Sequence, residues 1–278
     1  MLRRVRTRST SNILGEIEHL HRAYDYTGYN FFDDELNVSR TMVELMDGAT
    51  ALQTRLGVEF RLRGFIKAEL FTAEQAQAMQ RAGFRWILTG FESGSPRILR
   101  NIQKQATVED NDRCMDLARA NGLKVKALMS IGHAGETVET VNDTRDWLLR
   151  MRPDDFDCTV ITPYPGSPYY DEATPVADAE NTWQFTAKSG DTLYAESVDY
   201  TATADFYKGL HGAYVSHVWT PGLSAANLVE MRDGLEAEVR ERLAIPYNPS
   251  AAAVHYEHSM GQTGVLRSSP LRPESSVA

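Results

Sequence analysis

The feature of this sequence that most limits its fold is an alternation of two hydrophobic patterns. Short apolar or alternating runs, typical of strands, take turns with longer segments whose apolar residues recur every three or four positions. The predicted strands are residues 29–32, 58–66, 84–91, 123–131 and 156–162. The predicted helices are residues 12–26, a helix capped by Ser39, one capped by Thr72 and Gln75, one capped by Thr107, and residues 137–151. Strands that alternate with helices across short connections predict βαβ crossovers and a parallel sheet.

The two ends of the sequence depart from this alternation. The sequence opens on a helix, so we expect the repeat to lack its first strand and the sheet to be open beside residues 29–32. After residue 162, prolines and glycines interrupt the pattern, and a hairpin within 183–194 and a helix at 224–243 follow. We therefore expect a core at residues 1–173, a mainly helical extension at 174–246 and a disordered tail at 247–278.

Composition narrows the class of protein. Lys and Arg number 29 against 38 Asp and Glu, a net charge of -9, which does not favour binding to nucleic acid or to a membrane surface. No apolar run is long enough to span a bilayer and no signal-peptide pattern is present, so we expect a cytoplasmic protein. The hydrophobic share of 42% suits a globular chain with a large core, and the expected partner is a small-molecule substrate.

Polar runs follow three of the predicted strands, at residues 33–35, 90–95 and 131–137. The carboxyl ends of parallel strands carry the ligand-binding residues of βα barrels. Carboxylates such as Glu92 accept hydrogen bonds from ribose hydroxyls or from an ammonium group, and neighbouring glycines let a ligand approach the backbone. Taken alone, these runs predict a ligand-binding βα barrel, and their chemistry is one that a nucleoside with an amino-acid tail would use.

Each run also has a purely structural explanation. Residues 33–35 fit a turn before the next helix, residues 92–93 fit a helix cap, and residues 132–136 fit a glycine turn. Lys67, at the end of the strand 58–66, fits either a partner for a ligand carboxylate or a solvated lysine. His133 is a candidate acid or base, although a lone histidine is a weak signal.

Taken in order, these runs resemble the motifs of the radical S-adenosylmethionine (SAM) superfamily. Residues 31–35 resemble its second-strand motif, residues 131–137 its fifth-strand glycine motif, and residues 162–168 its sixth-strand exit. Residues 90–95, with Ile98, Leu99, Lys104 and Thr107, are similar to its fourth-strand signature. Ala134 stands where the family usually has proline. The resemblance covers residues 9–173, and residues 228–246 are more weakly similar to members that often carry a cobalamin-binding domain.

The resemblance implies an α/β fold, an incomplete (β/α)6 TIM-like barrel without its first strand. It implies SAM as cofactor, bound to a [4Fe-4S] cluster and cleaved reductively to a 5′-deoxyadenosyl radical. Carried over by position, the cofactor-binding residues are Asp33, Asp34, Glu35, Glu92, Ser93, Ile131 and Gly132. By the same resemblance, the first three would lie near the amino group of SAM or near the substrate, the next two would hold its ribose and methionine part, and the last two would lie against its adenine.

The sequence departs from the family at the cluster. The family holds its iron with three closely spaced cysteines after the first strand, whereas this chain has two cysteines, Cys114 and Cys158, in a predicted helix and a predicted strand. We expect both to be core residues and predict no metal ligands in this chain.

Three hypotheses follow from these observations. The first is an enzyme of this superfamily whose first strand and cysteines lie on a missing segment or a partner chain. The second is a degenerate, non-catalytic member that binds a nucleoside or a partner protein. The third is an unrelated βα-barrel enzyme. An in-frame segment with three closely spaced cysteines, encoded upstream of Met1, separates the first from the second.

Overall fold

A parallel sheet forms the centre of the molecule. The computed structural model describes residues 8–33, 35–198 and 215–246. The strands follow one another in the sheet in chain order, and every pair is parallel. They are β1 (Gly28–Phe31), β2 (Arg61–Ile66), β3 (Phe84–Glu92), β4 (Lys124–Ile131) and β5 (Asp155–Val160). The structure thus confirms the predicted α/β class and the positions of the strands.

A helix or helices precede every strand of this sheet, and the periodicity predicted all the α-helices among them except the one at Pro96–Asn101. They are α1 (Thr10–Tyr24), α2 (Met42–Leu56), α3 (Ala73–Ala82), α4 (Pro96–Asn101), α5 (Val108–Ala120) and α6 (Val138–Met151), with short 3-10 helices η1 (Leu36–Val38) and η2 (Ala68–Leu70). Capping boxes start α3 at Thr72 and α5 at Thr107, where the side chain accepts a backbone hydrogen bond. The expected cap at Ser39 is wrong by two positions, because α2 begins after Thr41 and Ser39 instead ends η1.

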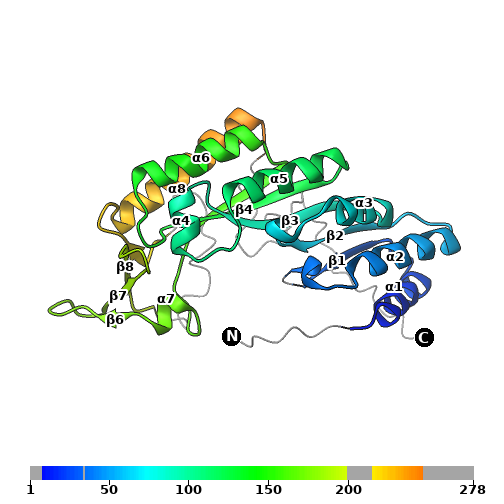
Figure 1. Cartoon of the computed structure of the whole chain (residues 1–278), viewed down its shortest axis with the longest axis horizontal. Helices are drawn as coiled ribbons and strands as arrows, with labels where there is room; N and C mark the ends of the chain where they lie inside the picture. The colour runs from blue at the N-terminus through cyan, green and yellow to red at the C-terminus, as the bar shows by residue number, and fades with distance from the viewer. Residues whose placement is uncertain (1–7, 34, 199–214, 247–278) are drawn as a thin grey trace, which may run out of the picture.

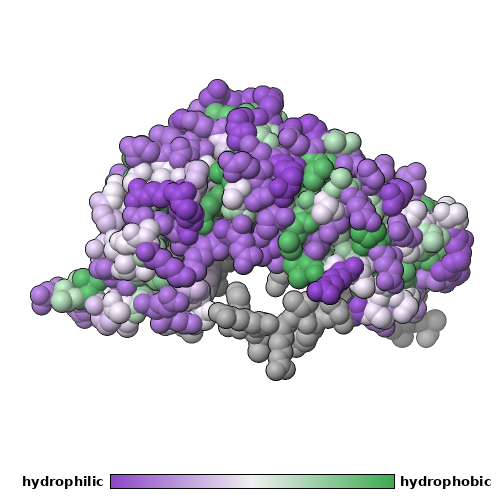
Figure 2. All heavy atoms as spheres, in the orientation of Figure 1, coloured by the Kyte–Doolittle hydropathy of each residue, from purple (hydrophilic) through white to green (hydrophobic). Residues whose placement is uncertain are grey.

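The helices pack along one side of the sheet, and together they form an arch (Figure 1). The core lies between the sheet and this helix layer, where its fully buried members include Met46, Met79, Ile87, Phe91 and Leu148. The surface seen in Figure 2 is mostly hydrophilic, with small apolar patches between the helices. The hydrophobic core thus supports the sheet from the side that the helices cover, and with it the strand ends that carry the polar residues.

Both outer strands of the sheet lack a further strand partner among the described residues. β1 pairs with β2 alone and β5 with β4 alone within that part of the chain. This agrees with the expected barrel that is open beside residues 29–32.

The region after β5 contains a second, smaller sheet. Helix α7 (Pro168–Asp171) leads into the antiparallel strands β6 (Thr174–Pro175), β7 (Thr182–Thr186), β8 (Thr192–Glu196) and β9 (Val218–Trp219), and α8 (Ala225–Leu243) follows. The predicted hairpin is β7–β8. The expected helical part of the extension is present as α8, and the short strands β6 and β9 were not predicted because two residues are too few to show a sequence period. The predicted tail, 247–278, lies outside the described residues.

Candidate functional site

A bulge at the carboxyl end of β3 sets the position of Glu92. The register between β3 and β4 shifts between Gly90 and Glu92, and Glu92 has a left-handed backbone with φ 65°. Such bulges re-aim side chains beside functional sites. A Cβ on Gly90 would lie 2.6 Å from the Glu92 Oε1 atom. Glycine at position 90 therefore leaves the room that this carboxylate occupies.

The Glu92 carboxylate is held from two sides and remains partly open to solvent. Lys104 Nζ lies 3.2 Å from Oε1, and the Ser130 hydroxyl donates a hydrogen bond to Oε2 over 2.8 Å. The Glu92 side chain is 31% exposed. A carboxylate offers about four acceptor positions, so this one can still accept hydrogen bonds from a ligand.

Behind Glu92, hydrogen bonds continue through His133 to Tyr169 on α7. Ser130 Oγ lies 2.9 Å from His133 Nε2, and His133 Nδ1 lies 3.1 Å from the Tyr169 hydroxyl. Burial lowers the pKa of His133 to about 4, so this imidazole is neutral at neutral pH. Burial also raises the pKa of Tyr169 above its ordinary value. Both nitrogens of His133 are thus engaged inside the protein.

The glycine run after β4 forms a turn that its own glutamate closes. Glu136 Oε2 accepts the backbone N–H of Gly132 over 3.0 Å and that of His133 over 3.3 Å, while Thr140 donates to Oε1. Burial raises the pKa of Glu136 to about 7. The sequence pattern placed Glu136 within the run but gave it no role. Its buried carboxylate shapes the turn that carries Gly132.

Two predicted site residues point into the protein. The Ser93 hydroxyl lies 3.0 Å from Thr144 Oγ1 on α6 and accepts the backbone N–H of Ser95 over 3.0 Å. Ile131 is fully buried, and its carbonyl accepts the Ile161 N–H over 2.9 Å. The Ser93 hydroxyl is therefore already occupied, and the Ile131 side chain belongs to the core.

The predicted acidic run after β1 lies beside a lysine at the end of β2. Glu35 is 3.8 Å from Lys67 Nζ, which also lies 3.3 Å from Glu69. Asn37 binds both backbone groups of Lys67, over 2.8 and 2.9 Å. Lys67 is thus an ion-paired residue, not the solvated lysine that one interpretation expected. Two neighbouring strands, β2 and β3, each end in a part-buried pair of lysine and glutamate.

The other two members of the acidic run are less closely tied to this pair. Asp33 is exposed and lines a cavity between α1 and β1, with Arg8, Ile17, Tyr29 and Phe32 among its walls. Asp34 lies outside the described residues. The structure thus places Glu35 at Lys67 and Asp33 at the outer side of β1.

The cysteines do not fit an iron–sulfur cluster. Cys114 lies on α5 and Cys158 on β5, both are buried, and burial raises the pKa of each thiol to about 12. Over residues 8–33, 35–198 and 215–246 there is no group of three His, Cys, Asp or Glu side chains placed to hold a metal ion. The described residues therefore present polar strand ends but offer no thiolate ligands to iron.

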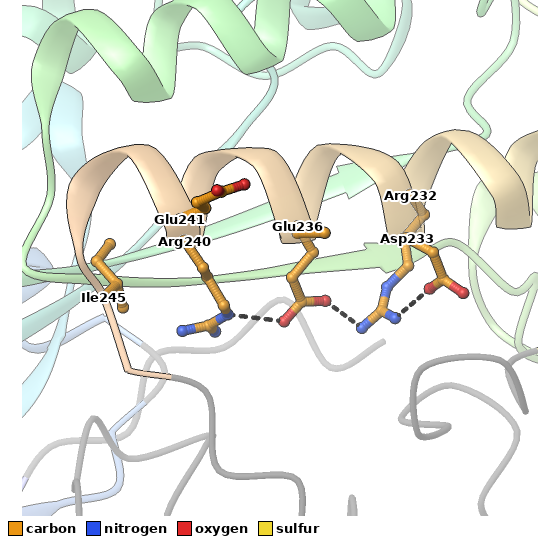
Figure 3. Close-up of a pocket in the computed structure, with 7 residues that line it drawn as sticks. Arg232, Asp233, Glu236, Arg240, Glu241 and Ile245 are labelled. Atoms are coloured by element: carbon orange, nitrogen blue, oxygen red, sulfur yellow. Dashed lines mark hydrogen bonds and ion pairs between the residues drawn. The ribbon is translucent and has the colours of Figure 1, made fainter.

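A separate cavity under α8 is lined by charged side chains (Figure 3). Glu236 lies 3.1 Å from Arg240 Nε and 2.6 Å from an Arg232 nitrogen, and Arg232 is also 2.7 Å from Asp233. Each charge in this row has an opposite charge beside it, and Arg232 and Arg240 also donate to backbone carbonyl groups of β5, so the row is part of the packing of α8 against β5. In the part of the chain that is described, no helix is long and apolar enough to cross a membrane.

Comparison with known proteins identifies the family. The model of the radical SAM superfamily matches residues 1–148. An uncharacterised methyltransferase of Pyrococcus horikoshii is 27% identical over 171 residues, which are 62% of this chain and 37% of that protein. The anaerobic magnesium-protoporphyrin IX monomethyl ester cyclase of Rubrivivax gelatinosus is 26% identical over 172 residues, which are 60% of this chain and 30% of the cyclase. The chain thus spans about a third of the length of these relatives.

A solved structure shows the same fold. The radical SAM methyltransferase TsrM of Kitasatospora setae, determined with cobalamin and a [4Fe-4S] cluster bound, superposes with a TM-score of 0.57 and 22% identity over 66% of this chain and 37% of TsrM. Together with the parallel βα architecture, the match of the family model over more than half of the sequence decides the assignment. The chain belongs to the radical SAM superfamily.

Proposed function

We propose that this chain is the SAM-binding part of a radical SAM enzyme, with Glu92 accepting hydrogen bonds from the ribose hydroxyls of SAM. The observation that carries the proposal is the Glu92 carboxylate itself. It lies at the carboxyl end of β3, is anchored by Lys104 and Ser130, and keeps acceptor positions open to solvent. An anchored carboxylate loses little side-chain freedom when it binds a diol.

The neighbouring strand ends supply the rest of the proposed site. The backbone at Ile131 and Gly132 would lie along the adenine, since neither residue offers a side chain there. Of the predicted acidic run, Glu35 beside Lys67 would face the amino group of SAM or the substrate, whereas Asp33 lies at the outer side of β1. In this proposal Ser93 supports the bulge that carries Glu92 and does not contact the cofactor with its occupied hydroxyl.

The described residues can bind and orient SAM, but they cannot hold the cluster that its reductive cleavage requires. A cluster, where the complete enzyme has one, would supply the electron for that cleavage. The second candidate, a degenerate member that binds a nucleoside without catalysis, is favoured by the two buried cysteines. An unrelated barrel enzyme is excluded, because the chain belongs to the superfamily.

Calorimetric titration with SAM and S-adenosylhomocysteine tests the proposal. Without a cluster to anchor the methionine part, we expect dissociation constants between micromolar and millimolar, about -8 to -4 kcal/mol. Glu92→Ala should weaken binding by about 1–3 kcal/mol, because a ribose hydroxyl loses a charged acceptor. Glu59→Ala is the matched control, since Glu59 is 89% exposed just before β2 and hence at the opposite end of the sheet.

Two results would contradict the proposal. If the wild type does not bind SAM at millimolar concentration, the proposed SAM site is wrong. If the wild type and Glu92→Ala bind SAM with equal affinity, the proposed contact between Glu92 and the ribose is wrong. To separate the enzyme from the degenerate member, the DNA upstream of Met1 is read for an in-frame strand followed by three closely spaced cysteines.

A further inference from the structure

Four side chains from three parts of the fold form one continuous line of hydrogen bonds. The line runs from Tyr169 on α7 to His133 after β4, to Ser130 on β4 and to Glu92 on β3, with separations of 3.1, 2.9 and 2.8 Å. Ser130 and His133 are buried, whereas Glu92 is partly exposed. The line therefore begins at the part-buried Tyr169, passes through two buried side chains and ends at the surface where a ligand would bind.

The number of protons available fixes the direction of every bond in this line. Ser130 has one hydroxyl proton, which it donates to the Glu92 carboxylate, so its oxygen must accept from His133 Nε2–H. A neutral imidazole carries one proton, so Nδ1 of His133 is left as an acceptor for the Tyr169 O–H. The backbone amide of Ala134 also interacts with the Tyr169 oxygen, which agrees with that oxygen being free to accept. All bonds thus point towards Glu92, an arrangement in which each bond strengthens the next.

We propose that Ser130, His133 and Tyr169 are positioning residues that hold the Glu92 carboxylate in its ligand-binding orientation, so that ligand affinity at Glu92 depends on the contact between His133 and α7. The part of this inference that concerns affinity rests on the proposed function of Glu92. The part that concerns the direction of the hydrogen bonds does not.

The extension takes part because Tyr169 also packs on the second sheet. Its ring meets that of Phe185 on β7 edge to face, with centroids 4.7 Å apart, and lies 5.9 Å from the His133 ring. Tyr169 is therefore held between the extension and the strand-end site. In this proposal, a change in the packing of Phe185 on Tyr169 reaches Glu92 through this line.

Removal of the Tyr169 hydroxyl tests the proposal most directly. Tyr169→Phe keeps the ring on Phe185 but deletes the first bond of the line, and we expect about threefold to tenfold weaker binding of S-adenosylhomocysteine by calorimetry. Tyr170→Phe is the matched control, because Tyr170 is the next residue on α7 and is 50% exposed; its affinity should equal that of the wild type. Equal affinity of Tyr169→Phe and the wild type would overturn the role of Tyr169.

Ser130 allows a test by restoration. Ser130→Ala removes the donor to Glu92 and should weaken binding by at least as much as Tyr169→Phe, whereas Ser130→Thr keeps a hydroxyl and should recover most of the loss. If Ser130 only filled space in the fold, Ser130→Thr would not be expected to bind the ligand more tightly than Ser130→Ala. If Ser130→Thr binds as poorly as Ser130→Ala while its circular dichroism and unfolding midpoint match those of the wild type, the hydroxyl has no positioning role.

Nitrogen-15 magnetic resonance of the histidine side chains tests the direction of these hydrogen bonds without any ligand, because it reports which nitrogen of His133 carries the proton. In the wild type, we expect His133 to be neutral with its proton on Nε2, and the assignment comes from the signal lost in His133→Gln. In Tyr169→Phe, the Nδ1 resonance should move, because its hydrogen bond is gone. A proton on Nδ1 in the wild type would overturn the direction of the line.

The two proposals fail in different ways. If no form of the protein binds SAM or S-adenosylhomocysteine but His133 carries its proton on Nε2, the proposed function and the affinity role fail while the directed line stands. If Glu92→Ala loses binding but Tyr169→Phe does not, Glu92 keeps its function and the positioning role is overturned.

Discussion

Arg232 on α8 donates its Nε–H to the carbonyl oxygen of Cys158 on β5, over 2.8 Å. Two turns later, Arg240 donates to the carbonyl oxygen of Phe156 over 2.7 Å. Among the described residues β5 pairs with β4 alone, so these carbonyl groups lie at the outer edge of the sheet. The arginines satisfy backbone acceptors that another strand would otherwise bind, and α8 thus covers this edge against further pairing.

The first prediction concerns this edge. Arg240 lies between Glu236 and Asp155, and Asp155 also pairs with the fully buried Lys126. Arg240→Leu removes one of the two cationic partners from each of these buried carboxylates and leaves the Phe156 carbonyl group without its donor, so it should lower the free energy of unfolding by about 3–5 kcal/mol. Urea unfolding followed by circular dichroism measures the loss.

A matched variant separates burial from charge. Arg242 is 59% exposed and pairs with Glu238 on the same helix, so Arg242→Leu should change stability by less than about 1 kcal/mol. If the two variants lost similar free energies of unfolding, the contact of Arg240 with the edge of β5 would contribute no more to stability than an exposed ion pair on the helix.

The second prediction concerns the pH dependence of stability. The folded-state pKa of Glu136, about 7, lies above the ordinary value of 4.5. The folded protein therefore binds this proton more tightly than the unfolded chain does. The resulting stability is fully present below about pH 4.5 and is lost as the pH rises through about 7.

Glu136→Gln isolates this effect, because glutamine imitates the protonated acid towards the Gly132 amide and Thr140. The unfolding free energy of the variant, relative to the wild type, should rise by roughly 3 kcal/mol between pH 4.5 and pH 8. The comparison between variants is needed because His133 acts in the opposite direction. Its lowered pKa gives stability that is present above pH 6.5 and lost as the pH falls through about 4. A difference that does not vary with pH would show that Glu136 ionises normally.

The third prediction concerns Gly132. Its φ is 90°, and a Cβ there would meet Val160 at 3.1 Å and Val218 at 3.2 Å. Gly132→Ala should lower the free energy of unfolding by about 1–3 kcal/mol, since both the backbone and the space oppose a side chain. Gly234 lies within α8, and a Cβ added there would have no atom within 4 Å, so Gly234→Ala should stabilise the protein by about 0.5–1 kcal/mol. Thermal unfolding of the two variants should thus shift in opposite directions.

Local pattern predicted the strands and most helix starts because these depend on neighbours in sequence. The capping box of Thr72 and Gln75 is an example, since both partners lie within one helical turn. The polar strand ends were found in the same way. The side-chain direction of Ser93 was not, because the bulge at Glu92 breaks the alternation of faces along β3.

Contacts between distant segments had no signal in the sequence. His133 and Tyr169 are 36 residues apart, and the sequence marked His133 as a candidate acid or base without linking it to Tyr169. Arg232 and Cys158 are 74 residues apart, and the apolar stripe of α8 suggested only hydrophobic packing. Such pairs are set by how α7 and α8 return to the sheet, which periodicity does not encode.

The last prediction concerns the cysteines. Both thiols are buried with pKa values of about 12, so neither is a thiolate at neutral pH and neither should react with a thiol reagent in the folded protein. Both should react once urea unfolds the chain.

The same burial bears on the cluster. Incubation of the chain with iron and sulfide should yield no stable four-iron cluster, because two buried thiols on α5 and β5 cannot replace three closely spaced cysteines. The measurements are the visible absorbance of a cluster and the iron bound per chain, with Cys114→Ala and Cys158→Ala as controls that should change neither. Iron near four per chain that is lost in either variant would show that the fold rearranges to build a cluster on these cysteines, and the SAM site would then have to be sought beside them and not at Glu92.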